Sequence, residues 1–204
     1  MTNQDWKQNI ILIQRDAYRR HGYHPNSLLW SSHEAQEIRF QILAQIGIEA
    51  GDSVLDIGCG FGDFSGFLEK HDKAVEYTGI DLSEDLVQEG RKQFPDINLI
   101  TTDLFEFDPK PNSYDYVTLS GTLNRKYSGS EEYALEVIQR MFETCRKGVA
   151  FNLLNARHEW TAGRWDLQSF VPDELLQELN IKTAKSEVID QYLDNDFTVY
   201  LLKD

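Results

Sequence analysis

The residues best suited to chemistry lie in one short stretch, SVLDIGCGFGDFSGFL, residues 53–68. An apolar run that carries Asp56 is followed by three alternating glycines, Gly58, Gly60 and Gly62. A strand, a glycine turn and a helix are a recurring way to hold an anionic or nucleotide-like ligand, because glycine has no Cβ and lets the backbone approach closely. At the end of the strand, Asp56 is placed to accept hydrogen bonds from loop N–H groups or from a ligand amine.

The next strand-like run ends in a second acid. Asp81 closes the run at 75–82 and lies 23 residues after Gly58, and a carboxylate in that position can accept both hydroxyls of a ribose. A dinucleotide fingerprint requires Gly-x-Gly-x-x-Gly, but Asp63 stands three residues after Gly60, where it would repel a pyrophosphate. A ligand with an amino group, a ribose and no phosphate fits better, and S-adenosylmethionine (SAM) is such a ligand.

In order and spacing, residues 30–204 resemble the class I SAM-dependent methyltransferases. The matching segments are VLDIGCGFGDFS for the glycine loop, YTGIDLS for the strand ending in the ribose acid, LITTDLFEF, and YDYVTLSG for the fourth strand. The resemblance implies that Asp103 hydrogen-bonds the adenine amino group and that Leu104 offers its backbone N–H. It also places Ser120, at the end of the fourth strand, beside the methyl donor.

The resemblance yields a set of cofactor residues but no catalytic residue and no metal ligand. Cys59 is common in this loop among such enzymes, so we interpret it as a loop residue and not as a nucleophile. The implied cofactor-binding residues are Asp56, Gly58, Cys59, Gly60, Gly62, Asp81, Leu82, Asp103, Leu104 and Ser120. The implied reaction is an in-line attack on the sulfonium methyl, in which the protein positions the partners and excludes water.

The implied fold is α/β, a doubly wound seven-stranded and mostly parallel sheet in the order 3-2-1-4-5-7-6, with the last strand antiparallel and helices on both faces. The strand-like runs of the sequence agree with this fold. They are residues 53–58, 75–82, 97–102, 114–120, 149–155, 187–193 and 197–202. Only Asp194–Asp196 joins the last two runs, which favours an antiparallel pair.

Two helices have clear signals. One begins with Ser31 and Glu34 at capping-box spacing, and its apolar stripe is Ala35, Ile38, Ile42 and Ile46. The other spans residues 130–148 and closes with Arg146 and Lys147, where cations suit the helix dipole.

The composition bounds the class of protein. The chain has 204 residues, 41% of them hydrophobic, and a formal net charge of −14, which disfavours binding to nucleic acid because phosphates are repelled. Cys59 and Cys145 lie far apart, so we expect free thiols and a cytoplasmic protein. The longest apolar run near the start is too short to span a membrane. We expect a helical cap segment at 1–30 and a methyltransferase domain at 31–204.

The acceptor residues carry the weakest signals. Loops after the fourth and fifth strands, SGTLNRKYSGS and NARHEWTAGRWDLQSF, lie where such folds bind ligands, although a solvated linker and sheet-edge packing of the tryptophans explain them as well. The basic segment at 15–30 is either a closure over the site or a surface helix whose arginines pair with carboxylates. The candidate acceptor residues are Tyr23, His24, Asn124, Arg125, His158 and Trp160.

The resulting hypothesis is methyl transfer from SAM to a small molecule. Two rivals stay open at this point: a non-catalytic protein that keeps the SAM site, and an NAD-dependent oxidoreductase, against which Asp63 argues. The sequence names neither the acceptor atom nor the oligomeric state.

Overall fold

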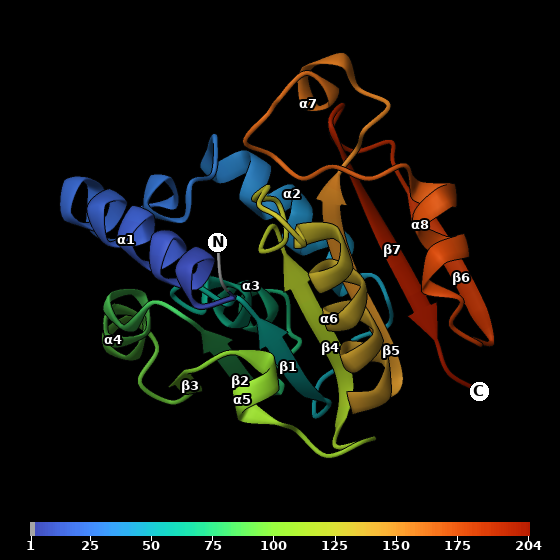
Figure 1. The fold of residues 1–204 in the computed structure, drawn as a ribbon. Coiled ribbons are helices and arrows are strands. Elements are labelled where there is room, and N and C mark those ends of the chain that lie inside the picture. Colours follow the sequence, from blue (N-terminus) through green and yellow to red (C-terminus); the bar gives the residue numbers. More distant parts are fainter. Residues whose placement is uncertain (1–2) are drawn as a thin grey trace.

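A computed structural model describes residues 3–204 and places helices on both sides of one sheet (Figure 1). The helices are α1 (Asn3–His21), the short 3-10 helix η1 (Pro25–Leu28), α2 (His33–Ala44), α3 (Asp63–Lys70), α4 (Glu84–Gln93), α5 (Leu104–Phe107), α6 (Ser130–Thr144), α7 (Glu159–Ala162) and α8 (Pro172–Leu179). The strands are β1 (Ser53–Ile57), β2 (Glu76–Asp81), β3 (Asn98–Thr101), β4 (Tyr114–Ser120), β5 (Cys145–Leu154), β6 (Lys185–Ile189) and β7 (Asp196–Leu202).

The strand order is β3-β2-β1-β4-β5-β7-β6. Strands β1 to β5 are parallel, whereas β7 is antiparallel to both β5 and β6. The predicted fold class is therefore confirmed. Between β1 and β4 the order of the strands reverses, and open α/β sheets bind their ligands at the carboxyl ends of the strands beside this point.

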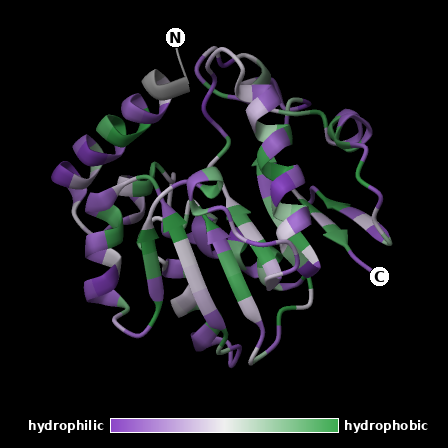
Figure 2. Ribbon diagram, turned by 60° about the horizontal axis from the view of Figure 1, so that its bottom comes forward, coloured by the Kyte–Doolittle hydropathy of each residue, from purple (hydrophilic) through white to green (hydrophobic). Residues whose placement is uncertain are grey.

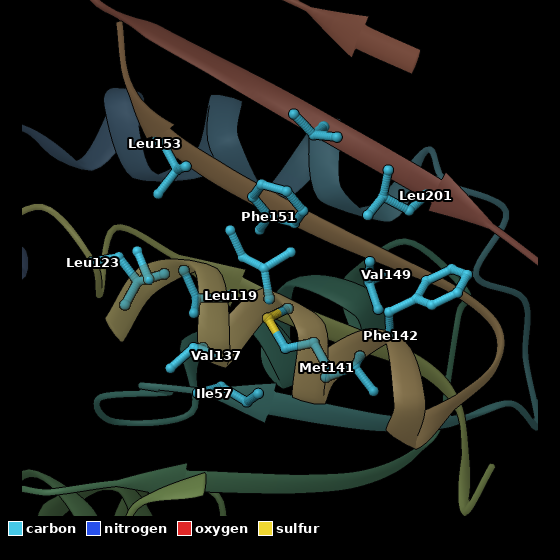
Figure 3. Close-up of a cluster of buried hydrophobic side chains, with 14 of the residues drawn as sticks. Ile57, Leu119, Leu123, Val137, Met141, Phe142, Val149, Phe151, Leu153 and Leu201 are labelled. Atoms are coloured by element: carbon cyan, nitrogen blue, oxygen red, sulfur yellow. The ribbon is translucent and has the colours of Figure 1, made fainter. Parts of the chain in front are cut away.

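Two apolar clusters hold the layers together, one on each face of the sheet. Consecutive β1 residues point to opposite faces: Leu55 packs in the cluster with α6 and α8, and Val54 packs in the cluster with α2, α3 and α4. Figure 3 shows the first cluster, where Met141 and Val137 of α6 lie against Leu119 of β4. Figure 2 shows hydrophobic residues along the strands and hydrophilic residues on the surrounding helices. The strand ends that carry the polar residues are thus fixed from both sides.

The boundary between α6 and β5 differs from the prediction. Arg146 and Lys147 do not end the helix; they lie in β5, which already begins at Cys145 opposite Tyr114. The physical reason is a pairing across the sheet: the Arg146 guanidinium donates to the Asp115 carboxylate of β4 at 3.1 Å. The link between β6 and β7 is also longer than predicted, residues 190–195.

Helix α2 turns a different face to the protein than its apolar pattern predicts. The predicted stripe was wrong in part, because Ile38 and Ile42 are only half-buried. The buried residues are Ala35, Gln36, Arg39, Phe40, Leu43 and Ala44. The N-cap is Ser32 and not Ser31, since the Ser32 hydroxyl accepts from the N–H of Ala35 at 3.1 Å.

Helix α1 lies over the carboxyl ends of β1, β2 and β3 (Figure 1). Two polar contacts join it to α4: the Arg15 guanidinium donates to Asp85, and the Tyr18 hydroxyl donates to Glu89, both at 2.9 Å. The division at residue 30 stays a prediction, but α1 and η1 do cover the strand ends from outside the sheet.

Candidate functional site

A cavity of about 440 Å³ opens at the carboxyl ends of β1 to β4. It contains the glycine turn on one side and the segments after β4 and β5 on the other. The candidate residues that line it are Asp56, Gly58, Cys59, Gly60, Asp81, Leu82, Asp103, Leu104, Ser120, Asn124, Arg125 and Trp160. Gly62 shapes the turn as the N-cap of α3, at φ +86°.

The glycine turn is held by Asp81. One carboxylate oxygen accepts the N–H of Gly60 at 2.9 Å, and the other accepts the N–H of Ser83 at 2.8 Å. Gly60 has φ +58°, and a Cβ there would lie 2.6 Å from a Leu28 methyl of η1. The backbone conformation therefore disfavours any residue with a side chain, and the Leu28 side chain would have to move to make room for one. Burial raises the pKa of Asp81, while the hydrogen bonds from the N–H groups of Ser83 and Gly60 oppose the rise.

Asp56 is a buried carboxyl at the bottom of the cavity. It accepts hydrogen bonds from the Tyr77 hydroxyl of β2 and from the Thr118 hydroxyl of β4, the latter at 3.0 Å. Burial raises the pKa of Asp56 to about 7, although both hydroxyls favour the charged form. Neighbouring strands thus hold an acid that titrates near neutral pH.

Asp103 sits at the end of β3 and caps α5. Its Oδ1 accepts the N–H groups of Phe105 at 2.8 Å and Glu106 at 3.0 Å, and its Oδ2 pairs with the Lys7 ammonium of α1. Burial opposes ionisation of Asp103, but the ammonium and these N–H groups outweigh it and hold its pKa below the usual range. The N-terminal helix is thereby tied to the acid that the resemblance assigns to adenine.

The residues at the end of β4 are positioned by β5. Asn152 is buried; its Oδ1 accepts the N–H of Gly121 at 2.9 Å, and its amide donates to the Ser120 hydroxyl at 3.1 Å. Gly121 has φ +67° and lies against the Trp30 ring, where a Cβ would come within 2.4 Å. Cys59 is buried, and this burial raises the pKa of its thiol well above the usual value, which does not suit a nucleophile.

The six candidate acceptor residues do not lie together. Asn124, Arg125 and Trp160 line the cavity. His158 instead caps α7, because its ring accepts the N–H of Trp160 at 3.3 Å. His24 caps η1 in the same way, accepting from Asn26 at 3.2 Å. These two histidines cap short helices and do not line the cavity. Of the six candidates, Asn124, Arg125 and Trp160 are the ones that line it.

Tyr23 and Asp63 join the cap segment to the glycine turn. The exposed Tyr23 hydroxyl donates to Asp63 at 2.7 Å, and the amide of Gln36 donates to the same carboxylate at 3.2 Å. Burial raises the pKa of Asp63. An acid at this position therefore anchors η1 and α2 to the first turn of α3.

Sequence reasoning missed several residues that the structure brings to the site. Arg39 is buried, pairs with Asp196 of β7, and lies 4.6 Å from the Trp30 ring. Lys7 and Trp6 of α1 were missed as well; Trp6 stacks on Tyr127 with ring centres 4.5 Å apart. Arg39 lies one helical turn after the buried Ala35, and this position was a signal in the sequence that could have found it. No local pattern pointed to Trp6 or Lys7.

A family model described as a methyltransferase domain matches residues 54–152. This segment runs from β1 into β5 and contains the glycine turn and the acids at the ends of β1, β2 and β3. Residues 54–152, just under half of the chain, therefore belong to this family of methyltransferase domains, and the sheet order is that of the class I SAM-dependent methyltransferases. Among residues 3–204, no helix has the length and apolar character needed to cross a membrane. In the same residues, no group of three His, Cys, Asp or Glu side chains gathers to hold a metal ion.

Similar proteins support this family membership. Demethylmenaquinone methyltransferase of Staphylococcus aureus is 26% identical over 117 residues, which are 55% of this chain and 48% of that enzyme. The chain therefore spans about half the length of the curated relatives it matches. Magnesium protoporphyrin IX methyltransferase from Synechocystis PCC 6803, solved with bound SAM, has a TM-score of 0.61 at 18% identity over 83% of this chain and 80% of that one.

The fold also occurs with another chemistry. The [4+2]-cyclase SpnF has a TM-score of 0.64 at 15% identity, and the match covers 85% of this chain and 83% of that one. Fold alone does not fix a reaction, so the activity has to be argued from the site.

Proposed function

We propose that this protein transfers the methyl group of SAM to a small-molecule acceptor. The observation that carries the proposal is the arrangement of Asp81 and Asp103, two buried carboxylates at the ends of neighbouring strands, beside a glycine turn that opens into one cavity. Carboxylates suit the ribose hydroxyls and the adenine amino group, which are hydrogen-bond donors. The volume of about 440 Å³ falls within the range of small-molecule sites.

The cofactor end fits an adenosine without phosphate. Each oxygen of Asp81 accepts one backbone N–H and keeps a lone pair for a ribose hydroxyl. Leu104 begins α5, and the first N–H groups of a helix have no partner inside it, so this N–H suits an adenine ring nitrogen. Asp56 would receive the ligand amine, directly or through water, and Gly58, Gly60 and Gly62 would let the backbone approach the methionine part.

The protein's part in the reaction is positioning and exclusion of water. SAM, when bound, supplies an activated methyl group. Trp6, Ile10 and Ile13 of α1 close the cavity above the strand ends, and Leu119 and Leu154 line it from the sheet side. Apolar walls of this kind hold the acceptor near its target without competing water. We assign no general base.

The cavity and the relatives support a small molecule as the acceptor. Demethylmenaquinone methyltransferase and magnesium protoporphyrin IX methyltransferase are named for small-molecule acceptors. By analogy we propose a small molecule here, bound beside Ser120 by the segments that carry Asn124, Arg125 and Trp160.

Two titrations and one assay test the proposal. Isothermal titration with S-adenosylhomocysteine (SAH) should give heat, and NADH should give none. Incubation with SAM and pooled metabolites should then release SAH. Absence of SAH binding at tens of micromolar would contradict the proposal, and binding without turnover would instead favour the non-catalytic protein.

A further inference from the structure

Charged residues are segregated within the cavity. The acids are Asp56 of β1, Asp81 of β2 and Asp103, which follows β3 and caps α5; they line the cofactor half of the cavity. The lining residues with arginine side chains, Arg39, Arg125 and Arg164, lie with Asp166 on the other side, on α2 and after β4 and β5. In a chain with a net charge of −14, a cationic half of a cavity favours an anionic ligand there.

The two arginine-bearing segments form one wall. The N–H of Lys126 donates to the Asp166 carbonyl at 3.1 Å, and the N–H of Gln168 donates to the Asn124 carbonyl at 3.0 Å. The Ser130 hydroxyl donates to the Gln168 side chain at 2.7 Å. Segments about 40 residues apart are therefore bonded to each other, which fixes the position of the arginines relative to the cavity.

Only one of the three guanidinium groups is without a strong partner. Arg39 is paired with the buried Asp196. Arg164 makes two hydrogen bonds of 2.7 Å to Asp166 and stacks over Trp160 at 5.1 Å. Arg125 approaches the same carboxylate only to 3.7 Å, and within residues 3–204 its side chain has no hydrogen bond. Because two guanidiniums share one carboxylate, this wall keeps one positive charge with free donors.

A second group beside Arg125 also lacks a partner. Asn124 lines the cavity, its Oδ1 is buried, and no described residue donates a hydrogen bond to this oxygen. A buried acceptor without a donor is costly. A ligand hydroxyl or amine would satisfy it.

We propose that the methyl acceptor is a small molecule that carries a carboxylate and an apolar body. Arg125 binds the carboxylate, since a guanidinium matches its two oxygens in one plane. Asn124 Oδ1 accepts a hydrogen bond from an O–H or N–H of the same molecule, and Trp160, Leu154 and Leu167 contact its apolar body. This inference rests on the proposed function and deepens it.

The test compares benzoate with benzamide, which has the same shape and no charge. Both are titrated into the SAH-saturated protein and followed by ligand-observed NMR. We expect benzoate to bind about tenfold more tightly or better, as for a charge-assisted hydrogen bond, and Arg125→Gln to remove the preference. Lys126→Gln is the matched control, because Lys126 carries the same charge on the same segment but is exposed, and it should keep the preference.

Three results would overturn the inference: equal binding of the two probes, no binding of either at millimolar concentration, or a preference that survives Arg125→Gln. The SAH titration of each variant is read separately. If the wild-type protein does not bind SAH, the proposed function is contradicted. If it binds SAH but shows no preference for benzoate, this inference alone is contradicted.

Discussion

Replacing Asp56 by Asn should change how the stability of the protein depends on pH. Burial raises the pKa of Asp56 from its ordinary 3.8 to about 7 in the folded protein. The folded state therefore binds the proton more tightly than the unfolded chain does. The stability that this proton contributes is fully present below about pH 4 and is lost as pH rises through about 7.

The size of the effect follows from the shift in pKa. A rise from 3.8 to about 7 corresponds to about 4 kcal/mol of stability lost between the two ends of this window. Asn is neutral at every pH and nearly the same shape, so Asp56→Asn removes this dependence. The Asn amide also changes the hydrogen bonds to Tyr77 and Thr118, which adds an offset of about 1 kcal/mol that does not vary with pH.

Urea unfolding of both proteins between about pH 4 and 8 measures the difference. We expect the free energy of unfolding of Asp56→Asn to gain on the wild type steadily up to about pH 7 and then to stay level. Glu84→Gln, at an exposed acid on α4, is the control and should show no such trend. A difference between Asp56→Asn and wild type that is flat with pH, or falls, would refute the reasoning.

Three further substitutions probe the cofactor end. Asp81→Asn leaves one loop N–H without its acceptor, so it should lower the free energy of unfolding by about 1–3 kcal/mol and weaken SAH binding about tenfold or more. Unchanged values in urea unfolding and in calorimetry would show that Asp81 neither holds the glycine turn nor binds the ribose. Gly60→Ala, at φ +58° beside Leu28, should cost about 1–2 kcal/mol of stability and weaken SAH binding. A variant that binds SAH as tightly as the wild type would show that the turn tolerates a side chain. Lys7→Gln frees Asp103 and should tighten SAH binding about fivefold, as for a partly exposed ion pair; calorimetry showing weaker binding would mean that Lys7 helps to hold the ligand.

Much of the sheet was predictable because its determinants are local. A buried parallel strand appears in the sequence as a continuous apolar run. The runs that become β1 and β4 could be recognised in this way, and the motifs at their ends match those of the family that the sequence resembles. The start of β5 was not predictable, since Arg146 is drawn into the sheet by Asp115 on a neighbouring strand. The helical periodicity of residues 130–148 gives no sign of that contact.

The residues of the site also fall into those that local motifs identify and those that depend on contacts between distant parts of the chain. The acids at the ends of β1, β2 and β3 were identified from motifs in the sequence, and the structure places all three around one cavity. Other parts of the cavity depend on pairs that are distant in the chain: Lys7 pairs with Asp103 in the cofactor half, and Arg39 pairs with Asp196 in the other half. Charge pairing between residues about 100 or more apart leaves no local pattern, so neither Lys7 nor Arg39 was predicted. His24 and His158, which were predicted as acceptor residues, each cap a short helix and do not line the cavity.

A crystal structure of the protein with SAH tests the central claim most directly. The account predicts the ribose hydroxyls on Asp81, the adenine beside Asp103 and Leu104, and the amino acid part over the glycine turn. A nucleoside bound elsewhere, or one in this cavity with no contact to Asp81, would contradict it.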